Sequence, residues 1–102
     1  MTALGDSLRE SAVFNLGGAV TMIVDDSPFS LTLTANALSG FGIRPSFAVN
    51  SGAQAKRVLQ EKTIDLLLVD TDMPDIDGFE LVRWLRRSGL NPNAFCPVIM
   101  TA

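Results

Sequence analysis

Short apolar runs alternate along this chain with segments of helical period. The strand candidates are AVTMIV at 19–24, SFAV at 46–49, IDLLLVD at 64–70 and CPVIMTA at 96–102. The run at 64–70 shows no alternation of apolar and polar residues, as expected of a central strand that is covered on both faces. Strands that alternate with helices predict an α/β fold, in which crossover helices connect the strands of a parallel sheet.

Three segments between the strand candidates carry helix start signals. Ser27 is followed by Pro28, Ser51 opens the second segment, and Asp77 precedes Glu80 at capping-box spacing. Helical spacing predicts these inward-facing side chains: Leu31, Ala35, Leu38 and Phe41; then Ala55, Val58 and Leu59; then Val82 and Leu85. The expected stops are Gly40, Gly42 and Gly89.

The composition favours one globular domain. The chain has 102 residues, of which 47% are hydrophobic, and a mean hydropathy of +0.29, so it can bury a core. Its formal net charge of −3 gives no broad positive field, and we expect no direct contact with nucleic acid. The single cysteine, Cys96, lies in an apolar stretch and is predicted to be a small buried thiol. No apolar run reaches the length of a membrane span, so we expect a soluble cytoplasmic protein without membrane contact.

The first 18 residues carry a helix signal of their own. Ser7 and Glu10 have capping-box spacing, and Gly17 and Gly18 follow as a stop. The side chains that share one face of this helix are Leu8, Ala12 and Leu16. The sequence therefore predicts an N-terminal extension at 1–18 containing an amphipathic helix, followed by the main domain at 19–102.

Oxygen-bearing side chains stand where several predicted strands end. Asp25 and Asp26 follow the first strand, Asp70 ends the third and Thr101 lies in the fourth. Since ligands of open parallel sheets bind beyond the carboxyl ends of the strands, these residues should converge on one rim. Clustered carboxylates repel one another and supply the hard oxygen ligands that Mg²⁺ prefers, whereas a chain with no histidine and one cysteine is unsuited to zinc. A carboxylate beside Mg²⁺ is also a feasible nucleophile toward phosphorus, which makes Asp70 a candidate phosphate acceptor.

Three motifs together resemble the response-regulator receiver domain of bacterial two-component signalling. They are the acidic pair after the first strand, the strand aspartate at 70 followed by MP and DG, and PVIMTA at 97–102. The resemblance implies that Asp70 is phosphorylated and that Asp25, Asp26, Asp70 and the backbone carbonyl of Asp72 bind Mg²⁺. It also implies that Thr101 supplies a switch hydroxyl and that the backbone N–H of Ala102 binds the phosphoryl group.

The same resemblance implies the fold, the partners and the activity. The fold would be a flavodoxin-like three-layer parallel sheet of strand order 2-1-3-4. The phosphoryl donor would be a phosphohistidine on a histidine kinase or a histidine phosphotransfer protein, docked near the helix that begins at Ser27. The protein would act as a signalling switch in a phosphorelay, with self-phosphorylation and autodephosphorylation but no turnover of a separate substrate.

The sequence also departs from the receiver pattern. Family members continue after the switch threonine with a fourth helix, a fifth strand ending in a lysine and a fifth helix, whereas this sequence ends at Ala102. We therefore expect a sheet without these elements and without a counterpart of the catalytic lysine. An exposed sheet edge invites pairing with another chain, so a homo-oligomer formed through that edge or the N-terminal helix is predicted.

Two alternatives remain open at this point. The first is a pseudo-receiver that acts only as a protein-interaction module and does not bind Mg²⁺. The second is a phosphatase of the haloacid-dehalogenase type, because LLLVDTD at 66–72 is similar to the nucleophile motif of those enzymes. In that class the nucleophile strand comes first and the acidic pair late, whereas Asp25 and Asp26 precede Asp70 here.

Overall fold

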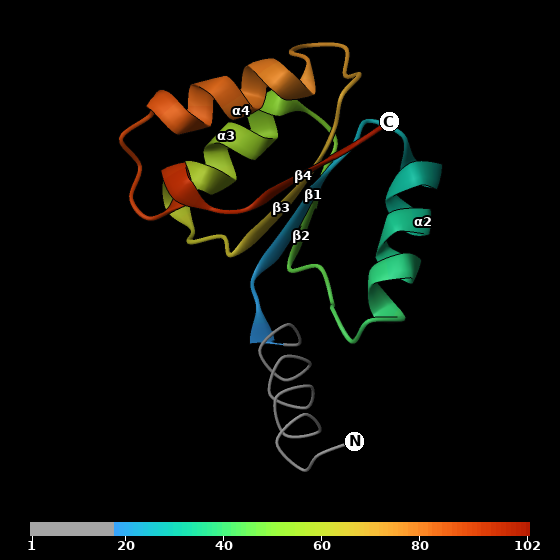
Figure 1. Cartoon of the computed structure of the whole chain (residues 1–102). Helices are drawn as coiled ribbons and strands as arrows, with labels where there is room; N and C mark the ends of the chain where they lie inside the picture. The colour runs from blue at the N-terminus through green and yellow to red at the C-terminus, as the bar shows by residue number, and fades with distance from the viewer. Residues whose placement is uncertain (1–17) are drawn as a thin grey trace, which may run out of the picture.

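The computed structural model describes residues 18–102, in which one parallel sheet lies between two layers of helices (Figure 1). The strands are β1 (Thr21–Val24), β2 (Phe47–Val49), β3 (Leu66–Asp70) and β4 (Val98–Thr101), paired in the order β2-β1-β3-β4. The helices are α2 (Pro28–Ser39), α3 (Gly52–Glu61), α4 (Gly78–Arg87) and the short 3₁₀ helix η1 (Asn93–Phe95). The predicted α/β class and strand order are confirmed. The N-terminal extension predicted over 1–18 lies outside the described residues, apart from Gly18.

The central strands are apolar throughout because helices cover both faces of the sheet. Helix α2 lies on one face, and α3 and α4 lie on the other (Figure 1). Met22 and Val69 belong to the larger core, which they share with buried residues of α3 and α4. Ile23 and Leu68, whose side chains point the opposite way, pack in a smaller core with Leu38 of α2. A strand enclosed in this way holds the residues at its carboxyl end in fixed positions.

Each of the three α-helices α2, α3 and α4 described within residues 18–102 begins at its predicted cap. The cap side chain accepts a hydrogen bond from the backbone N–H three residues later, which satisfies one of the free donors of the first turn. The caps Ser27, Ser51 and Asp77 make this bond at 3.2, 3.2 and 2.8 Å. The helix starts were therefore predictable from local sequence.

The end of α2 corrects one expectation. Phe41 was expected to continue the apolar face of this helix, but α2 ends at Ser39 and the Phe41 side chain is 69% exposed. The Ile43 N–H bonds to the Leu38 carbonyl at 3.0 Å, and Gly42 has a φ of 77°, which a glycine adopts readily. The chain therefore turns back after Ser39, and Ile43 becomes the buried residue in place of Phe41.

The inward face of α4 and the lengths of the strands also differ from expectation. Leu81 and Leu85 are the buried residues of α4, whereas Val82 is half-buried. The first and third strands begin two residues later than predicted. Ahead of them, the Val20 N–H donates to the Asp65 carboxylate at 2.8 Å and not to a backbone carbonyl of the ladder. The buried state predicted for Cys96 is confirmed, and burial raises the pKa of its thiol.

The segment before β4 makes contacts that a local pattern does not reveal. The buried side chain of Asn93 accepts a hydrogen bond from the Ile64 N–H at 2.9 Å. Its amide group donates to the carbonyls of Leu59 and Lys62 at 2.7 and 2.6 Å, at the end of α3. Arg86 is exposed, and its guanidinium donates to the Ala94 carbonyl at 2.9 Å. The Asn93 side chain therefore caps the end of α3, and a side chain of α4 binds the backbone of this segment.

Candidate functional site

The carboxyl edge of the sheet gathers the acidic residues predicted from the sequence. Asp25 and Asp26 directly follow β1, and Asp70 is the last residue of β3. One carboxylate oxygen from each of them lies within 4.8 Å of the others. Because β1 and β3 pair in parallel, both strands deliver their carboxyl ends to the same side. The expected convergence of these carboxylates is therefore what the structure shows.

Asp25 is the innermost member of this cluster and is 6% exposed. Its backbone N–H bonds to the Val49 carbonyl at 3.0 Å, and its carboxylate accepts a hydrogen bond from the Ser27 N–H at 3.0 Å. Burial raises the pKa of Asp25, the Ser27 bond opposes that shift, and the charges of Asp70 and Asp26 add to it. The native fold thus holds a carboxylate whose charged form is disfavoured compared with that of an exposed aspartate.

The loop after β3 is fixed against the Asp70 backbone. The Asp72 N–H donates to the Asp70 carboxylate at 3.3 Å, and the Gly78 N–H donates to the Thr71 carbonyl at 3.0 Å. A Cβ atom at Gly78 would overlap the Asp70 carbonyl oxygen and crowd a methyl group of Val69. Only glycine permits this approach. In the DG pair at 77–78, Asp77 caps α4 and Gly78 makes the close contact with the Asp70 backbone.

Thr101 lies beside Asp70 because the two residues are register partners of β3 and β4. The Thr71 N–H donates to the Thr101 carbonyl at 2.9 Å, which continues the ladder past Asp70. A cavity of about 210 Å³ opens here, lined by Asp25, Ser30, Leu33, Thr34, Asp70, Thr101 and Ala102. The C-terminal end of the chain lies close to the start of α2 (Figure 1).

One wall of this cavity was not predicted. Ser30, Leu33 and Thr34 come from the first turns of α2 and stand three or four residues apart, so they share one helix face. Helical spacing directly after the acidic pair was the signal that could have found them. Asp72 is exposed, and its side chain does not belong to the carboxylate cluster.

The carboxylates at this edge fit a magnesium ion. Mg²⁺ holds oxygen ligands at about 2.1 Å in an octahedron, so two of its ligand atoms lie about 3 to 4 Å apart. The oxygens of Asp25, Asp26 and Asp70 lie within 4.8 Å of one another, and small side-chain rotations reach that spacing. The three carboxylates supply hard, anionic oxygen ligands. Asp25 is buried and Asp26 is exposed, so a cation bound between them would face solvent on one side and could keep part of its water.

Comparison with known proteins gives the family of this chain. The profile of the response regulator receiver domain matches residues 21–102. The chain belongs to this family. Its members are signalling modules of two-component systems, so the predicted family and its place in signal transduction are confirmed.

Several known proteins are similar to this receiver domain. The sensor histidine kinase RcsC of Escherichia coli (strain K12) is 35% identical over 81 residues, which are 79% of this chain and 8% of RcsC. The transcriptional regulatory protein ZraR of Klebsiella oxytoca is 38% identical over 82 residues, which are 79% of this chain and 17% of ZraR. The crystal structure of the signal receiver domain of a signal transduction histidine kinase from Syntrophus aciditrophicus matches with a TM-score of 0.73 and 32% identity, over 83% of this chain and 62% of that one.

These similarities cover only part of each relative. The receiver domain described here spans less than a fifth of RcsC or ZraR, at 8% and 17% of their lengths. Within residues 18–102, no helix is both long enough and apolar enough to cross a bilayer.

Proposed function

We propose that this receiver domain is the phosphoacceptor of a phosphorelay, in which Asp70 is phosphorylated in a reaction that depends on Mg²⁺. The observation that supports this proposal most strongly is the cluster of three carboxylates, with one oxygen of each within 4.8 Å of the others, beside an open cavity. A cluster of this kind is costly without a cation. It is also placed where a phosphoryl group can reach Asp70 from solvent.

The proposed reaction moves one phosphoryl group. The Asp70 carboxylate attacks the phosphorus of a phosphohistidine, a P–O bond forms, and the P–N bond breaks with its electron pair staying on the imidazole nitrogen. When bound, Mg²⁺ offsets negative charge that gathers on the phosphoryl oxygens. Asp25, Asp26 and Asp70 would hold the ion together with the backbone carbonyl of Asp72. The half-buried Asp70 side chain keeps one oxygen on the Asp72 N–H, which orients it for attack.

Two further groups would bind the transferred phosphoryl group. The Thr101 hydroxyl and the backbone N–H of Ala102 belong to residues that line the cavity beside Asp70. Hydrogen bonds from these donors would be stronger to a dianionic phosphoryl group than to water, because one partner is charged. Thr101 would then act as the switch hydroxyl of the domain.

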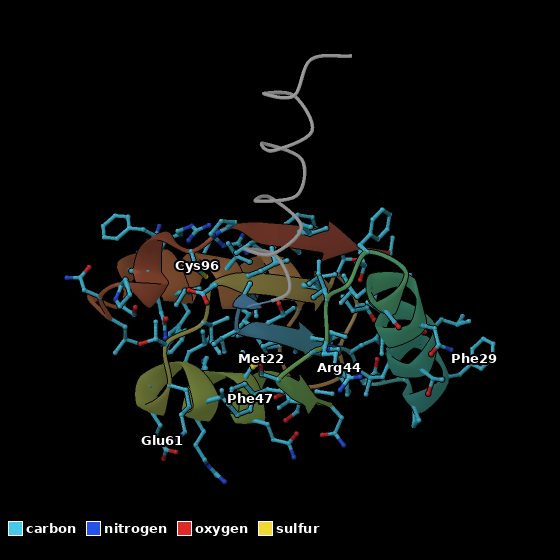
Figure 2. The ribbon with its side chains drawn as sticks, turned by 90° about the horizontal axis from the view of Figure 1, so that it is seen from below. Met22, Phe29, Arg44, Phe47, Glu61 and Cys96 are labelled. Carbon is cyan, nitrogen blue, oxygen red and sulfur yellow. The ribbon has the colours of Figure 1, made fainter. Side chains whose placement is uncertain are left out.

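The partner proposed for this site is a histidine kinase or a histidine phosphotransfer protein. Phe29 on α2 is 73% exposed and Leu33 is 53% exposed, and Leu33 also lines the cavity. Figure 2 shows Phe29 on the outer side of α2, pointing away from the sheet. Exposed apolar side chains beside a reactive group are typical of an interaction surface. A donor that docks on α2 would present its phosphohistidine to Asp70.

The test is labelling of Asp70 by acetyl phosphate, a small phosphoryl donor. We expect stoichiometric labelling of the wild-type chain that requires Mg²⁺, survives acid and is lost in base, as an acyl phosphate is. Asp70→Asn should remove the label. Glu80→Gln is the control, because this exposed carboxylate on α4 lies outside the cluster and should leave labelling unchanged.

The outcomes separate this proposal from the alternatives. Absence of both Mg²⁺ binding and labelling in the folded wild-type chain would favour the pseudo-receiver interaction module. Turnover of a generic phosphate ester would contradict our expectation that no separate substrate is turned over. The family match speaks against the haloacid-dehalogenase alternative.

Self-association through the sheet edge stays a prediction. Strand β4 has a neighbour on one side only within the described residues, and Ile99 in that strand is 48% exposed. Light scattering that shows only monomers at tens of micromolar would contradict it. The cytoplasmic location and the absence of nucleic-acid contact stay predictions from the sequence as well.

A further inference from the structure

A side-chain contact ties the loop at 71–77 to the start of α3. The carboxylate of Asp75, in this loop, accepts hydrogen bonds from the N–H groups of Gly52 and Ala53 at 3.1 and 3.0 Å. These are two of the four backbone donors that the first turn of a helix leaves free. An anionic acceptor also suits the positive end of the helix dipole.

The contact between loop and helix leaves no spare room. Gly52 is buried, and a Cβ atom added there would overlap the Ile76 side chain and touch the Asp75 carboxylate. The backbone of α3 and the loop therefore meet directly. A loop held by two hydrogen bonds and a close packing contact has few alternative positions at this point.

The same loop carries the fourth ligand of the proposed cation site, the backbone carbonyl of Asp72. Its start is fixed by the Asp72 N–H, which donates to Asp70, and its end by Gly78, which donates to Thr71. Asp75 fixes the middle of the loop, three residues beyond Asp72. The Asp75 carboxylate itself lies outside the cluster formed by the three site aspartates, so it is not a candidate ligand.

We propose that Asp75 is a positioning residue, which holds the Asp72 carbonyl at the cation site by tying its loop to the first turn of α3. This inference rests on the proposed function, because it assumes that the site binds Mg²⁺. Coupling between two sites is reciprocal. Mg²⁺ binding therefore also stabilises the first turn of α3, which transmits the state of the cation site to the helix.

The experiment compares Asp75 with a second cap on the same helix turn. The Ser51 hydroxyl caps Gln54 at 3.2 Å but makes no hydrogen bond with the loop. Ser51→Ala therefore weakens the helix start without touching the loop, whereas Asp75→Ala removes both the cap and the tie. Mg²⁺ affinity is measured by isothermal titration calorimetry of the wild-type chain, Asp75→Ala, Asp75→Asn and Ser51→Ala.

We expect Asp75→Ala to weaken Mg²⁺ binding about tenfold, at the lower end of effects seen for groups that orient a metal ligand. Ser51→Ala should stay within about twofold, since it loses a cap of similar energy but no contact with the loop. Asp75→Asn should recover part of the loss, because its amide oxygen can still accept one of the two hydrogen bonds. Urea unfolding of every variant confirms that each one is folded under the titration conditions.

Amide hydrogen exchange gives a second measurement. Mg²⁺ should slow exchange of the Gly52 and Ala53 amides in the wild-type chain and in Ser51→Ala, but not in Asp75→Ala. Equal Mg²⁺ affinity in wild type and Asp75→Ala would overturn the inference and leave the proposed function standing. Equal weakening by Asp75→Ala and Ser51→Ala would also overturn it, since helix stability alone would then explain both. A wild-type chain that binds no Mg²⁺ would overturn the proposed function and this inference together.

Discussion

Removal of one charge from the aspartate cluster should stabilise the metal-free protein. Asp25→Asn eliminates the buried carboxylate, while the amide oxygen can still accept the hydrogen bond that the Ser27 N–H donates at 3.0 Å. Two repulsions, with Asp26 and with Asp70, are lost. The volume of the side chain changes little, so packing around position 25 should be preserved.

The magnitude follows from the spacing of the charges. Two unit charges 4.8 Å apart repel by about 0.9 kcal/mol at the dielectric constant of water and by about 3.5 kcal/mol at an effective value near 20. Asp26 is exposed, so solvent screens the cluster and the lower figure applies to part of it. The two pairs together give an expected rise in the free energy of unfolding of about 2–3 kcal/mol.

The assay is urea unfolding at pH 7 in the presence of a chelator, followed by the fluorescence of Trp84, the one tryptophan of the chain. Asp77→Asn is the control: its carboxylate is an exposed helix cap outside the cluster, and the substitution should change stability by less than about 0.5 kcal/mol. Added Mg²⁺ should remove most or all of this difference in stability. At a hundred times its Kd, an ion bound only by the native state adds about 2.7 kcal/mol to the wild type, and the variant should gain little.

Acidification gives an independent check that Asp25→Asn raises the free energy of unfolding. Because burial and the neighbouring carboxylates raise the pKa of Asp25, its charged form costs the native state free energy at neutral pH. That cost disappears as the pH falls through the raised pKa, so the gap between variant and wild type should shrink. If Asp25→Asn is no more stable than wild type in chelator at pH 7, repulsion in the cluster is too weak to require a cation, and the reasoning fails.

Three further changes test other parts of the structure. Asn93→Ala removes three hydrogen bonds and leaves the Ile64 N–H without its partner, so urea titration should show a loss of about 2–4 kcal/mol; a loss under about 1 kcal/mol would contradict the importance of this cap. Gly78→Ala forces the backbone away from the Asp70 carbonyl, which should lower the free energy of unfolding by about 1–3 kcal/mol and weaken Mg²⁺ binding in calorimetry. An unchanged free energy of unfolding together with an unchanged Mg²⁺ affinity would refute the close approach. Hydrogen bonds from α3 amides lower the pKa of Asp75, so its stabilising contribution is present at neutral pH and is lost as the pH falls through that lowered pKa. Acid unfolding of Asp75→Ala should lack this part of the pH dependence. Identical acid-unfolding curves for the variant and the wild type would show that the carboxylate contributes nothing to stability.

The architecture and the aspartate cluster were predictable because local patterns determine them. An apolar run such as 64–70 has to lie in the centre of a sheet, and parallel pairing then brings Asp70 to the same edge as Asp25 and Asp26. The helix starts followed from single cap residues. These signals depend only on neighbouring positions, which a sequence displays directly.

The contacts between distant segments were not predictable. Asp75 lies in an acidic stretch that carries no spacing signal, yet its partners lie 22 and 23 positions earlier in the chain. Asn93 lies between the predicted elements, yet its side chain reaches residues 29 to 34 positions away. Phe41 was assigned to the core on helical spacing, but the turn after Ser39 gave that place to Ile43. In each case tertiary structure selects a partner that no spacing rule specifies.

The two remote caps on α3 have a consequence for how the chain folds. Asp75 at one end of this helix and Asn93 at the other are delivered by segments that follow β3 and α4. Bonds between such distant positions form only after the intervening chain has been ordered, at the cost of loop-closure entropy. We expect both ends of α3 to consolidate late in folding, so phi values at Asp75 and Asn93 should be close to zero, and an excised peptide spanning 50–63 should be unstructured in water.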